Sequence, residues 1–315
     1  MAQVVLYAQT AVMNWDAVNG WDTQADGLGT DYTNPQNGGG TTYACDLNGK
    51  AVTMNVNVVI DALNKSSGNL TVDPGTFSLT LATSTSTFSG TSPILVGNLV
   101  NFTLITNGNY YTNNGTGYGI NVSGTGTVTI NEPGTTIFVN TSSGRGIYLG
   151  GSGTSNITGN WTQSGSGNGI LIGGAGTNNI TGDPYVSGTG TGLNPNASGS
   201  TTNFSGMPYR LATAAGAPLW VSVGTCNWTG AQTLGAGVDC YVVVSGGTLD
   251  TTGLAIANSG NLMIRRYAGT LTQGTGTITQ QTAAAQACVG GANYTITGPV
   301  AASIIGLNTP ILMAA

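Results

Sequence analysis

Two carboxylates, Glu132 and Asp183, are the candidate acid–base pair of this sequence. Hydrolysis of a glycosidic bond needs two carboxyl groups about 5 to 9.5 Å apart. Between residues 75 and 238 these are the only acidic residues, and each is followed by a proline, as is typical of a turn. The turn context favours a structural role, so we do not expect an active site at Glu132 and Asp183.

Basic residues are equally sparse. The chain contains no histidine, and Arg145 is the only basic residue between residues 66 and 209. A lyase needs a base beside a group that neutralises developing charge. We therefore expect no catalytic activity and no cofactor. The glycine-rich runs match no phosphate-binding fingerprint, because no lysine follows them at the required spacing.

Three aspartates, Asp22, Asp26 and Asp31, occupy a glycine-containing loop near the start of the chain. Carboxylate oxygens are the ligands that calcium prefers, which makes these residues a weak calcium candidate. Their spacing is not that of an EF-hand, and aspartates also form local turns. We favour turns and surface charge over a metal site.

The four cysteines Cys45, Cys226, Cys240 and Cys288 show no C-x-x-C spacing, and with no histidine a zinc site is not expected. Cys226 and Cys240 are close enough in sequence to close a loop if oxidised. In a reducing compartment, buried free thiols are the favoured alternative.

Aromatic residues in the middle of the chain leave carbohydrate binding open. A sugar platform could be built from Trp161, Tyr148, Tyr118, Tyr110 and Tyr111. Aromatic residues also fill cores and subunit contacts, which we favour here. A cell-surface glycan thus remains a candidate partner.

Charge limits the other partners. Only 5% of residues are charged, against about 25% in an average globular protein. Six basic residues cannot neutralise a phosphate backbone, so nucleic acid is not expected as a partner. A net charge of −5 and the lack of a run of about 20 apolar residues disfavour a membrane.

An internal repeat organises the elements that must position these residues. Gly-Ile-Tyr-Leu-Gly-Gly at 146–151 recurs as Gly-Ile-Leu-Ile-Gly-Gly at 169–174, and Asn-Ile-Thr-Gly at 156–159 recurs at 179–182, both at an offset of 23. Each repeat holds short runs of β-branched and aromatic residues between glycine and asparagine turns. Such units stack at about 4.8 Å to bury a shared core. The sequence therefore predicts an all-β parallel β-helix.

This pattern resembles the parallel β-helix solenoids of viral fibres, tailspikes and extracellular bacterial proteins, over about residues 76–206. We predict three parts: an N-terminal β-rich attachment head at 1–74, the β-solenoid at 75–208 and a C-terminal β domain at 209–315. Residues 52–60 alternate strictly and predict a half-buried strand in the head. The C-terminal part is predicted as a compact β-sandwich, with continuation of the solenoid as the alternative.

The segment from Trp15 through the glycine loop at 26–29 to the turn at 46–50 resembles the amino-terminal modules of tailed-phage virion proteins. The resemblance implies a non-enzymatic virion structural protein, a fibre or capsid-decorating protein that forms a homotrimer and docks on other capsid or tail proteins. The first fifteen residues lack the pattern of a secretory signal, so we expect assembly in the host cytoplasm and a final location in the virion.

The residues predicted for docking and assembly are Trp15, Trp21, Ile311, Leu312 and Met313, the last three in an apolar C-terminal tail. Two alternatives to the virion function stay open. The first is an extracellular bacterial β-solenoid adhesin, and the second is a polysaccharide-degrading tailspike.

Overall fold

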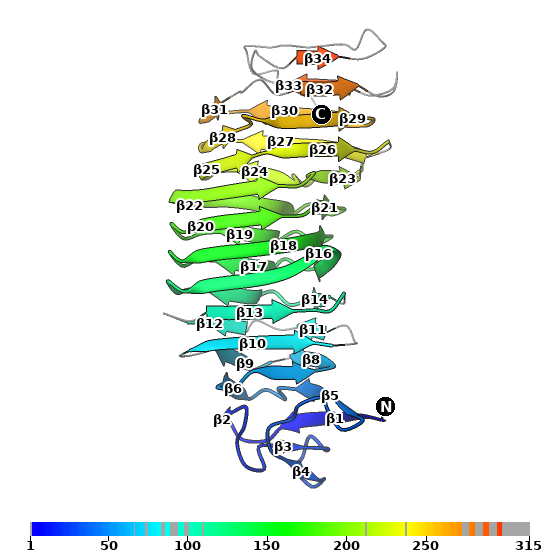
Figure 1. Cartoon of the computed structure of the whole chain (residues 1–315), viewed down its shortest axis with the longest axis vertical. Helices are drawn as coiled ribbons and strands as arrows, with labels where there is room; N and C mark the ends of the chain where they lie inside the picture. Colours follow the sequence, from blue (N-terminus) through cyan, green and yellow to red (C-terminus); the bar gives the residue numbers. More distant parts are fainter. Residues whose placement is uncertain are drawn as a thin grey trace.

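The chain winds into a rod whose strands lie across its long axis (Figure 1). The computed structural model describes residues 2–272, with gaps at 66, 73–74, 83–85, 89–93, 98–100, 109, 212 and 237, and the strands at 277–280, 286–289 and 295–297. Every helix or strand assigned within these residues is a β-strand, and consecutive coils pair in parallel, which confirms the all-β parallel β-helix. In this part of the chain no helix is long and apolar enough to span a membrane.

Each coil contributes strand to three faces of the rod. In one coil, β17 (Arg145–Leu149) lies on face 1, and β18 (Thr154–Gln163) turns a corner from face 2 to face 3. In the next coil Ile170 pairs with Ile147 and Ile180 pairs with Ile157, both at an offset of 23. The sequence repeat is therefore one coil of the solenoid.

The strands of the three faces follow the chain in order. Face 1 consists of β2 (Val12–Asn14), β6 (Ala51–Met54), β9 (Asn69–Val72), β12 (Ile94–Val96), β15 (Tyr118–Val122), β17, β19 (Asn168–Ile172), the start of β22 (Thr191–Ser205), β24 (Leu219–Val221), β27 (Val238–Val244), β30 (Asn261–Arg266) and β33 (Gln286–Val289). Face 2 consists of β7 (Val58–Ile60), β10 (Thr76–Leu81), β13 (Asn101–Ile105), the start of β16 (Thr127–Asn140) and of β18, β20 (Thr177–Thr181), the end of β22, β25 (Val223–Trp228), β28 (Thr248–Asp250) and β31 (Thr270–Thr272).

Face 3 consists of β1 (Ala2–Ala8), β5 (Thr41–Asp46), β8 (Ala62–Lys65), β11 (Ser86–Phe88), β14 (Tyr111–Asn113), the ends of β16 and β18, β21 (Pro184–Val186) and β23 (Tyr209–Leu211). Beyond β23, a separate parallel sheet is formed by β26 (Gly230–Leu234), β29 (Leu254–Asn258), β32 (Thr277–Gln280) and β34 (Thr295–Thr297).

The sheets run across both predicted domain boundaries. Around residue 74, β9 pairs in parallel with β6 before it and with β12 after it. Around residue 208, β24 pairs with β22 and then with β27. The described strands after 208 thus continue the solenoid, and the prediction of a compact β-sandwich is wrong. The cause is the irregular spacing: Leu219 follows its partner Leu193 by 26 residues, which hides the repeat.

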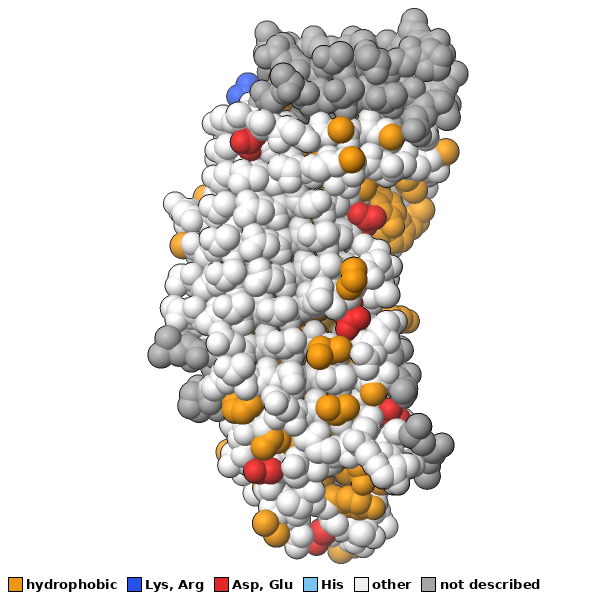
Figure 2. All heavy atoms as spheres, viewed as in Figure 1, with side chains coloured by type: hydrophobic (Ala, Val, Ile, Leu, Met, Phe, Trp, Pro, Cys, Tyr) orange, Lys and Arg blue, Asp and Glu red, His pale blue; other side chains and the backbone are white. Residues whose placement is uncertain are grey.

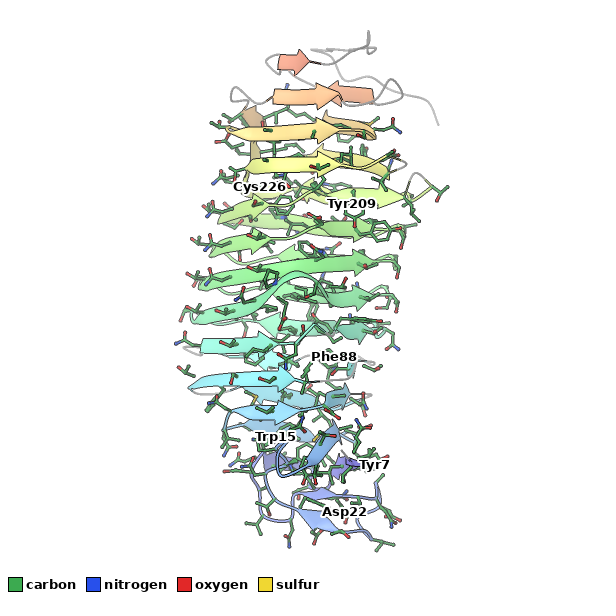
Figure 3. All side chains as sticks on the ribbon, turned by 45° about the vertical axis from the view of Figure 1, so that its right-hand side comes forward. Tyr7, Trp15, Asp22, Phe88, Tyr209 and Cys226 are labelled. Atoms are coloured by element: carbon green, nitrogen blue, oxygen red, sulfur yellow. The ribbon has the colours of Figure 1, made fainter. Side chains whose placement is uncertain are left out.

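The N-terminal end of the rod is closed by an antiparallel unit. β3 (Trp21–Asp22) pairs antiparallel with β1 and with β4 (Asp31–Tyr32). Trp15 and Trp21 are fully buried beneath this unit, with ring centroids 4.7 Å apart. Figure 3 places Trp15 and Asp22 at this end of the rod. An open end of a parallel sheet invites pairing with another chain, and the antiparallel unit covers it.

The core is a series of stacked inward side chains. Along β18 the residues alternate strictly between partly exposed and buried, with Ile157 and Trp161 pointing inward. Four aromatic rings stack from coil to coil along the rod, those of Phe88, Tyr111, Phe138 and Trp161. The stack buries a large apolar surface in each of these coils and joins their cores into one continuous core.

Candidate functional site

The two candidate catalytic carboxylates share one corner of the rod, between face 2 and face 3. Asn131 pairs with Thr158, which pairs with Thr181, so Glu132 and Asp183 follow equivalent positions two coils apart. Two coils correspond to about 10 Å. The two residues therefore lie about two coils apart at the same corner of the rod.

Both carboxylates are engaged with backbone. Glu132 is almost fully buried, and its Oε1 accepts N–H bonds from Thr106 (2.6 Å) and Asn107 (3.0 Å). Asp183 Oδ1 accepts the N–H of Met207 at 2.7 Å. Each carboxylate thus joins its own corner to that of a neighbouring coil, as charge-assisted bonds to backbone N–H groups do.

The three aspartates of the calcium candidate make local contacts. Asp22 is buried, and its Oδ1 accepts the N–H groups of Gln24 (2.6 Å) and Gly29 (3.1 Å). Asp26 Oδ1 accepts the N–H of Leu28 at 3.1 Å, and Asp31 is exposed. Within the described residues no three acidic, cysteine or histidine side chains converge as metal ligands. The contacts of Asp22 and Asp26 are those of aspartate turns.

The predicted docking tryptophans lie inside the fold. Trp21 Nε1 donates to the carbonyl oxygen of Trp15 at 2.9 Å, and Trp15 Nε1 donates to that of Pro35 at 3.3 Å. Both rings are fully buried, so they support the N-terminal unit and offer no surface to a partner. The other predicted assembly residues, Ile311, Leu312 and Met313, lie outside the described residues.

Apolar side chains that sequence reasoning missed are exposed at the N-terminal end. Val12, Val18 and Leu28 are 71%, 82% and 79% exposed. They are separated in sequence and follow no periodic pattern, so only the folded loop shows that they are exposed. Exposed apolar side chains gathered at one end of a protein are typical of a contact surface.

Three cysteines, Cys45, Cys226 and Cys240, are buried free thiols, as predicted. Burial raises the pKa of the Cys226 thiol to about 12, and it also raises the pKa of Cys45 and of Cys240. A thiol that stays protonated is a poor nucleophile and a poor metal ligand. These cysteines act as small core residues, and the side chain of Cys288 lies outside the described part.

The five candidate platform aromatics lie in three separate places. Trp161 and Tyr111 are fully buried in the core stack, where Trp161 Nε1 donates to the carbonyl oxygen of Gly192 at 2.9 Å. Tyr118 and Tyr148 instead project outward from face 1, and their rings stack at 5.0 Å with an interplanar angle of 18°. Tyr110 is exposed at a different corner. The core role favoured from the sequence thus holds for Trp161 and Tyr111, the five aromatics form no single platform, and a tyrosine pair remains on the surface.

Arg145 completes this pair. Its Nη1 donates to the hydroxyl oxygen of Tyr118 at 2.6 Å, and its guanidinium carbon lies 4.9 Å from the Tyr118 ring centroid and 5.7 Å from that of Tyr148. Tyr118 and Arg145 are register partners in adjacent strands, so the β-ladder itself brings them together. A guanidinium over an aromatic face is held by cation–π attraction.

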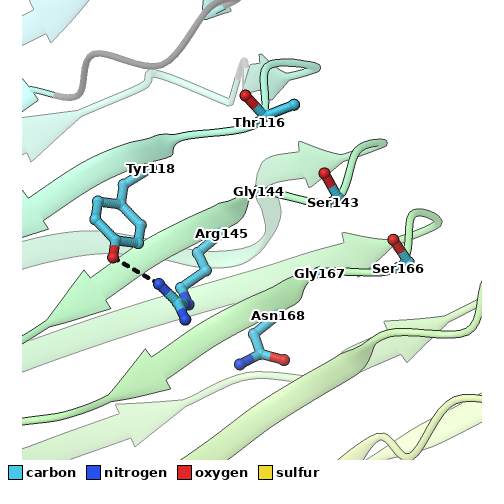
Figure 4. A pocket seen from close by; sticks show the side chains of 8 residues that line it. All are labelled: Thr116, Tyr118, Ser143, Gly144, Arg145, Ser166, Gly167 and Asn168. Carbon is cyan, nitrogen blue, oxygen red and sulfur yellow. Dashed lines mark hydrogen bonds between the residues drawn. The ribbon is translucent and has the colours of Figure 1, made fainter.

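A hollow of about 370 Å³ opens beside Arg145 (Figure 4). Tyr118, Arg145 and Asn168 form one wall, each from a successive coil. The opposite side consists of turn residues of the same three coils, among them Ser143 and Ser166. The backbone of Gly144 and Gly167 leaves the space between them free of side chains. The hollow is therefore polar, with one positive charge.

Face 2 presents a second kind of surface. Its outward asparagines form a ladder in which each Nδ2 donates to Oδ1 of the asparagine in the preceding coil at 2.9 Å: Asn179 to Asn156, Asn203 to Asn179 and Asn227 to Asn203. Beside it, seven successive coils place a threonine at one outward position: Thr127, Thr154, Thr177, Thr201, Thr225, Thr248 and Thr270. Figure 2 shows few charged side chains along the middle of the rod.

The exterior of the rod thus offers three surfaces for a partner: the N-terminal apolar residues, the hollow beside Arg145 and the flat, nearly uncharged face 2. Of the residues that line the hollow, only Tyr118 was among the binding candidates suggested by the sequence. Comparison with protein-family models, with curated proteins and with solved structures finds no match to this chain.

Proposed function

We propose that this chain is a non-enzymatic structural protein of a virus particle, a fibre or capsid-decorating protein of a tailed phage that projects a β-solenoid. The observation that carries the proposal is the parallel stacking of coils along faces 1 and 2, which runs from β2 to β31 in the described part of the chain. A rod of stacked coils is an elongated, quasi-one-dimensional body that can project from its point of attachment.

The N-terminal end docks the rod on other virion proteins. Val12, Val18 and Leu28 supply the apolar contact there, in place of the tryptophans that the sequence suggested. Face 2 packs three rods side by side into a homotrimer, because its flat, nearly uncharged surface can be desolvated without burying unpaired charge. Assembly takes place in the host cytoplasm, and neither nucleic acid nor membrane is a partner.

Light scattering on the purified full chain measures its oligomeric state and tests the assembly. Immunogold labelling of virus particles isolated from the sample that contains the gene tests the location. We expect a trimer, and antibody labelling at the attachment points of the particles. The double variant Val18→Asp, Leu28→Asp should stay trimeric and lose attachment, whereas the control Leu211→Asp, at an exposed apolar position far along the rod, should keep it. A monomer together with labelling of bacterial surfaces would replace this proposal by the adhesin.

The second candidate, an extracellular adhesin, is favoured by one observation, the polar hollow beside Arg145. The third, a polysaccharide-degrading tailspike, requires Glu132 and Asp183 to act on substrate. Cleavage of a host polysaccharide that disappears in Glu132→Gln and in Asp183→Asn, with both variants folded, would establish the tailspike. The backbone bonds of the two carboxylates lead us to expect no cleavage by the wild type.

A further inference from the structure

We propose that the hollow beside Arg145 binds an acidic saccharide, a sugar ring that carries a carboxylate. The chemistry of its walls is the starting point. Arg145 holds a positive charge at the rim, and Tyr118 holds an aromatic ring beside it, 4.9 Å from the guanidinium carbon. A guanidinium pairs with a carboxylate through two parallel N–H bonds, and an aromatic face packs against the apolar face of a sugar ring.

The guanidinium is positioned and still has donors to offer. Its bond from Nη1 to the Tyr118 hydroxyl, at 2.6 Å, fixes its orientation. Among the described residues, the remaining guanidinium N–H groups of Arg145 make no hydrogen bond and no carboxylate pairs with it. An arginine already oriented by a neighbour loses less entropy when it binds a ligand.

The other wall supplies groups suited to hydroxyls. Ser143, Ser166 and Thr116 present hydroxyl groups from the turns, and Asn168 presents an amide (Figure 4). Hydroxyl and amide groups both donate and accept, as sugar hydroxyls require. A simple inorganic anion would use the arginine and leave these groups and the ring without a function.

The size of the hollow fits one or two sugar rings. It spans three coils, about 10 Å along the rod axis, and has a volume of about 370 Å³. Ligand sites commonly begin at about 300 Å³. Its floor is backbone because Gly144 and Gly167 stack directly on the turns of the preceding coils, where a Cβ atom would collide with carbonyl oxygens. The inference goes beyond the proposed function and does not depend on it.

Titration of the full chain with 3′-sialyllactose, with trigalacturonate and with neutral lactose, followed by calorimetry or ligand-observed NMR, tests the site. The wild type should bind at least one acidic sugar about tenfold more tightly than lactose. Arg145→Gln should remove that preference. Arg266→Gln, an exposed arginine several coils away, is the matched control and should retain it.

Two further variants keep the test decisive if Arg145→Gln does not fold, as judged by circular dichroism. Arg145→Lys keeps the positive charge but loses the paired N–H donors of the guanidinium. Tyr118→Phe keeps the aromatic ring but loses the hydrogen bond from Arg145 Nη1. Each variant should weaken acidic-sugar binding several-fold. Equal binding of acidic and neutral sugars, no saturable binding at millimolar sugar, or equally strong competition by acetate would each overturn the assignment.

Discussion

Amide side chains have two different functions in this molecule, depending on the side of the sheet they face. Inside the rod, Asn113, Asn140 and Gln163 form a buried ladder in which each amide group donates to the next, at 3.0 and 2.7 Å. Outside, the asparagines of face 2 form a similar ladder in contact with water. Only the inner ladder also binds turn carbonyls, so only the inner ladder fixes the corner between faces 3 and 1.

Replacing Asn140 by alanine should therefore be costly. Asn140 Nδ2 also donates to the carbonyl oxygen of Gly144 at 2.8 Å, which would be left buried without a partner. We expect a loss of about 2–4 kcal/mol in the free energy of unfolding. The matched control is Asn179→Ala in the exposed ladder, where water replaces the lost bonds and the change should stay below about 1 kcal/mol. Equal losses from both variants, measured by urea unfolding, would contradict the distinction between the ladders.

The buried lysine Lys65 makes stability depend on pH. Burial lowers its pKa from 10.5 to about 8, and its ammonium lies 5.7 Å from the Phe88 ring centroid. Between these two pH values the unfolded chain still holds a proton that the folded chain has released, so folding becomes more favourable as pH rises.

The wild type should accordingly gain stability relative to Lys65→Met from pH 8 to 10.5, by about 3 kcal/mol at most. The difference in stability between the two proteins cancels the contributions of the cysteines and tyrosines, which titrate in both. Thermal or urea unfolding of both proteins at several pH values measures it. A difference that stays constant across this range would show that Lys65 keeps its ordinary pKa in the folded protein.

At the scale of the strand, glycine is what allows large rings to stack inside a narrow coil. The repeated glycine of face 1 faces an aromatic ring across the core in successive coils: Gly119 faces Tyr111, Gly146 faces Phe138 and Gly169 faces Trp161. The recurrence of this glycine in successive coils therefore reflects a packing contact between two faces of the rod.

Gly169→Ala should destabilise the fold through this contact. A Cβ atom there would lie 2.5 Å from the carbonyl oxygen of Gly192 and 2.7 Å from Cδ1 and Nε1 of Trp161, whose ring is fully buried. Overpacking of this kind costs about 1–3 kcal/mol. Gly38→Ala, where a Cβ atom meets nothing within 4 Å, is the control and should be nearly neutral. Similar melting temperatures for both variants would refute the packing argument.

Strand-scale patterns also explain what the sequence could and could not predict. The 23-residue repeat was sufficient to predict the coil, because adjacent coils of equal length place like residues in register. The 27-residue offset from Gly119-Ile120 to Gly146-Ile147 is visible in the sequence and gives the register that pairs Tyr118 with Arg145, but the position of the guanidinium beside the tyrosine rings depends on side-chain packing, which the offset does not specify. The antiparallel N-terminal unit was missed for a similar reason: its strands have only two residues each, too few to show alternation.

At the scale of the whole molecule, each coil contacts mainly its neighbours. Removing one entire coil should therefore leave the fold intact. Deletion of residues 146–168 joins Arg145 to Gly169, which restores the register of every face. We expect a β-rich protein that unfolds cooperatively and whose free energy of unfolding is lower by the contribution of one coil interface. Circular dichroism and thermal unfolding measure this.

Deletion of residues 146–157 is the control, because it removes about half a coil and brings strands of different faces into line. Apolar side chains would then point outward, and we expect this protein to aggregate or remain unfolded. If both deletions behave alike, the coils do not act as independent, interchangeable units.

The direction of the sheets has a mechanical consequence. The backbone hydrogen bonds between coils run along the rod, since the strands lie across it (Figure 1). A pull applied between the two ends of the rod loads the coil interfaces in series, and one interface can open while the others remain closed. Such a rod would extend under tension in discrete steps, with each step in the regular region releasing the 23 residues that separate Ile147 from Ile170.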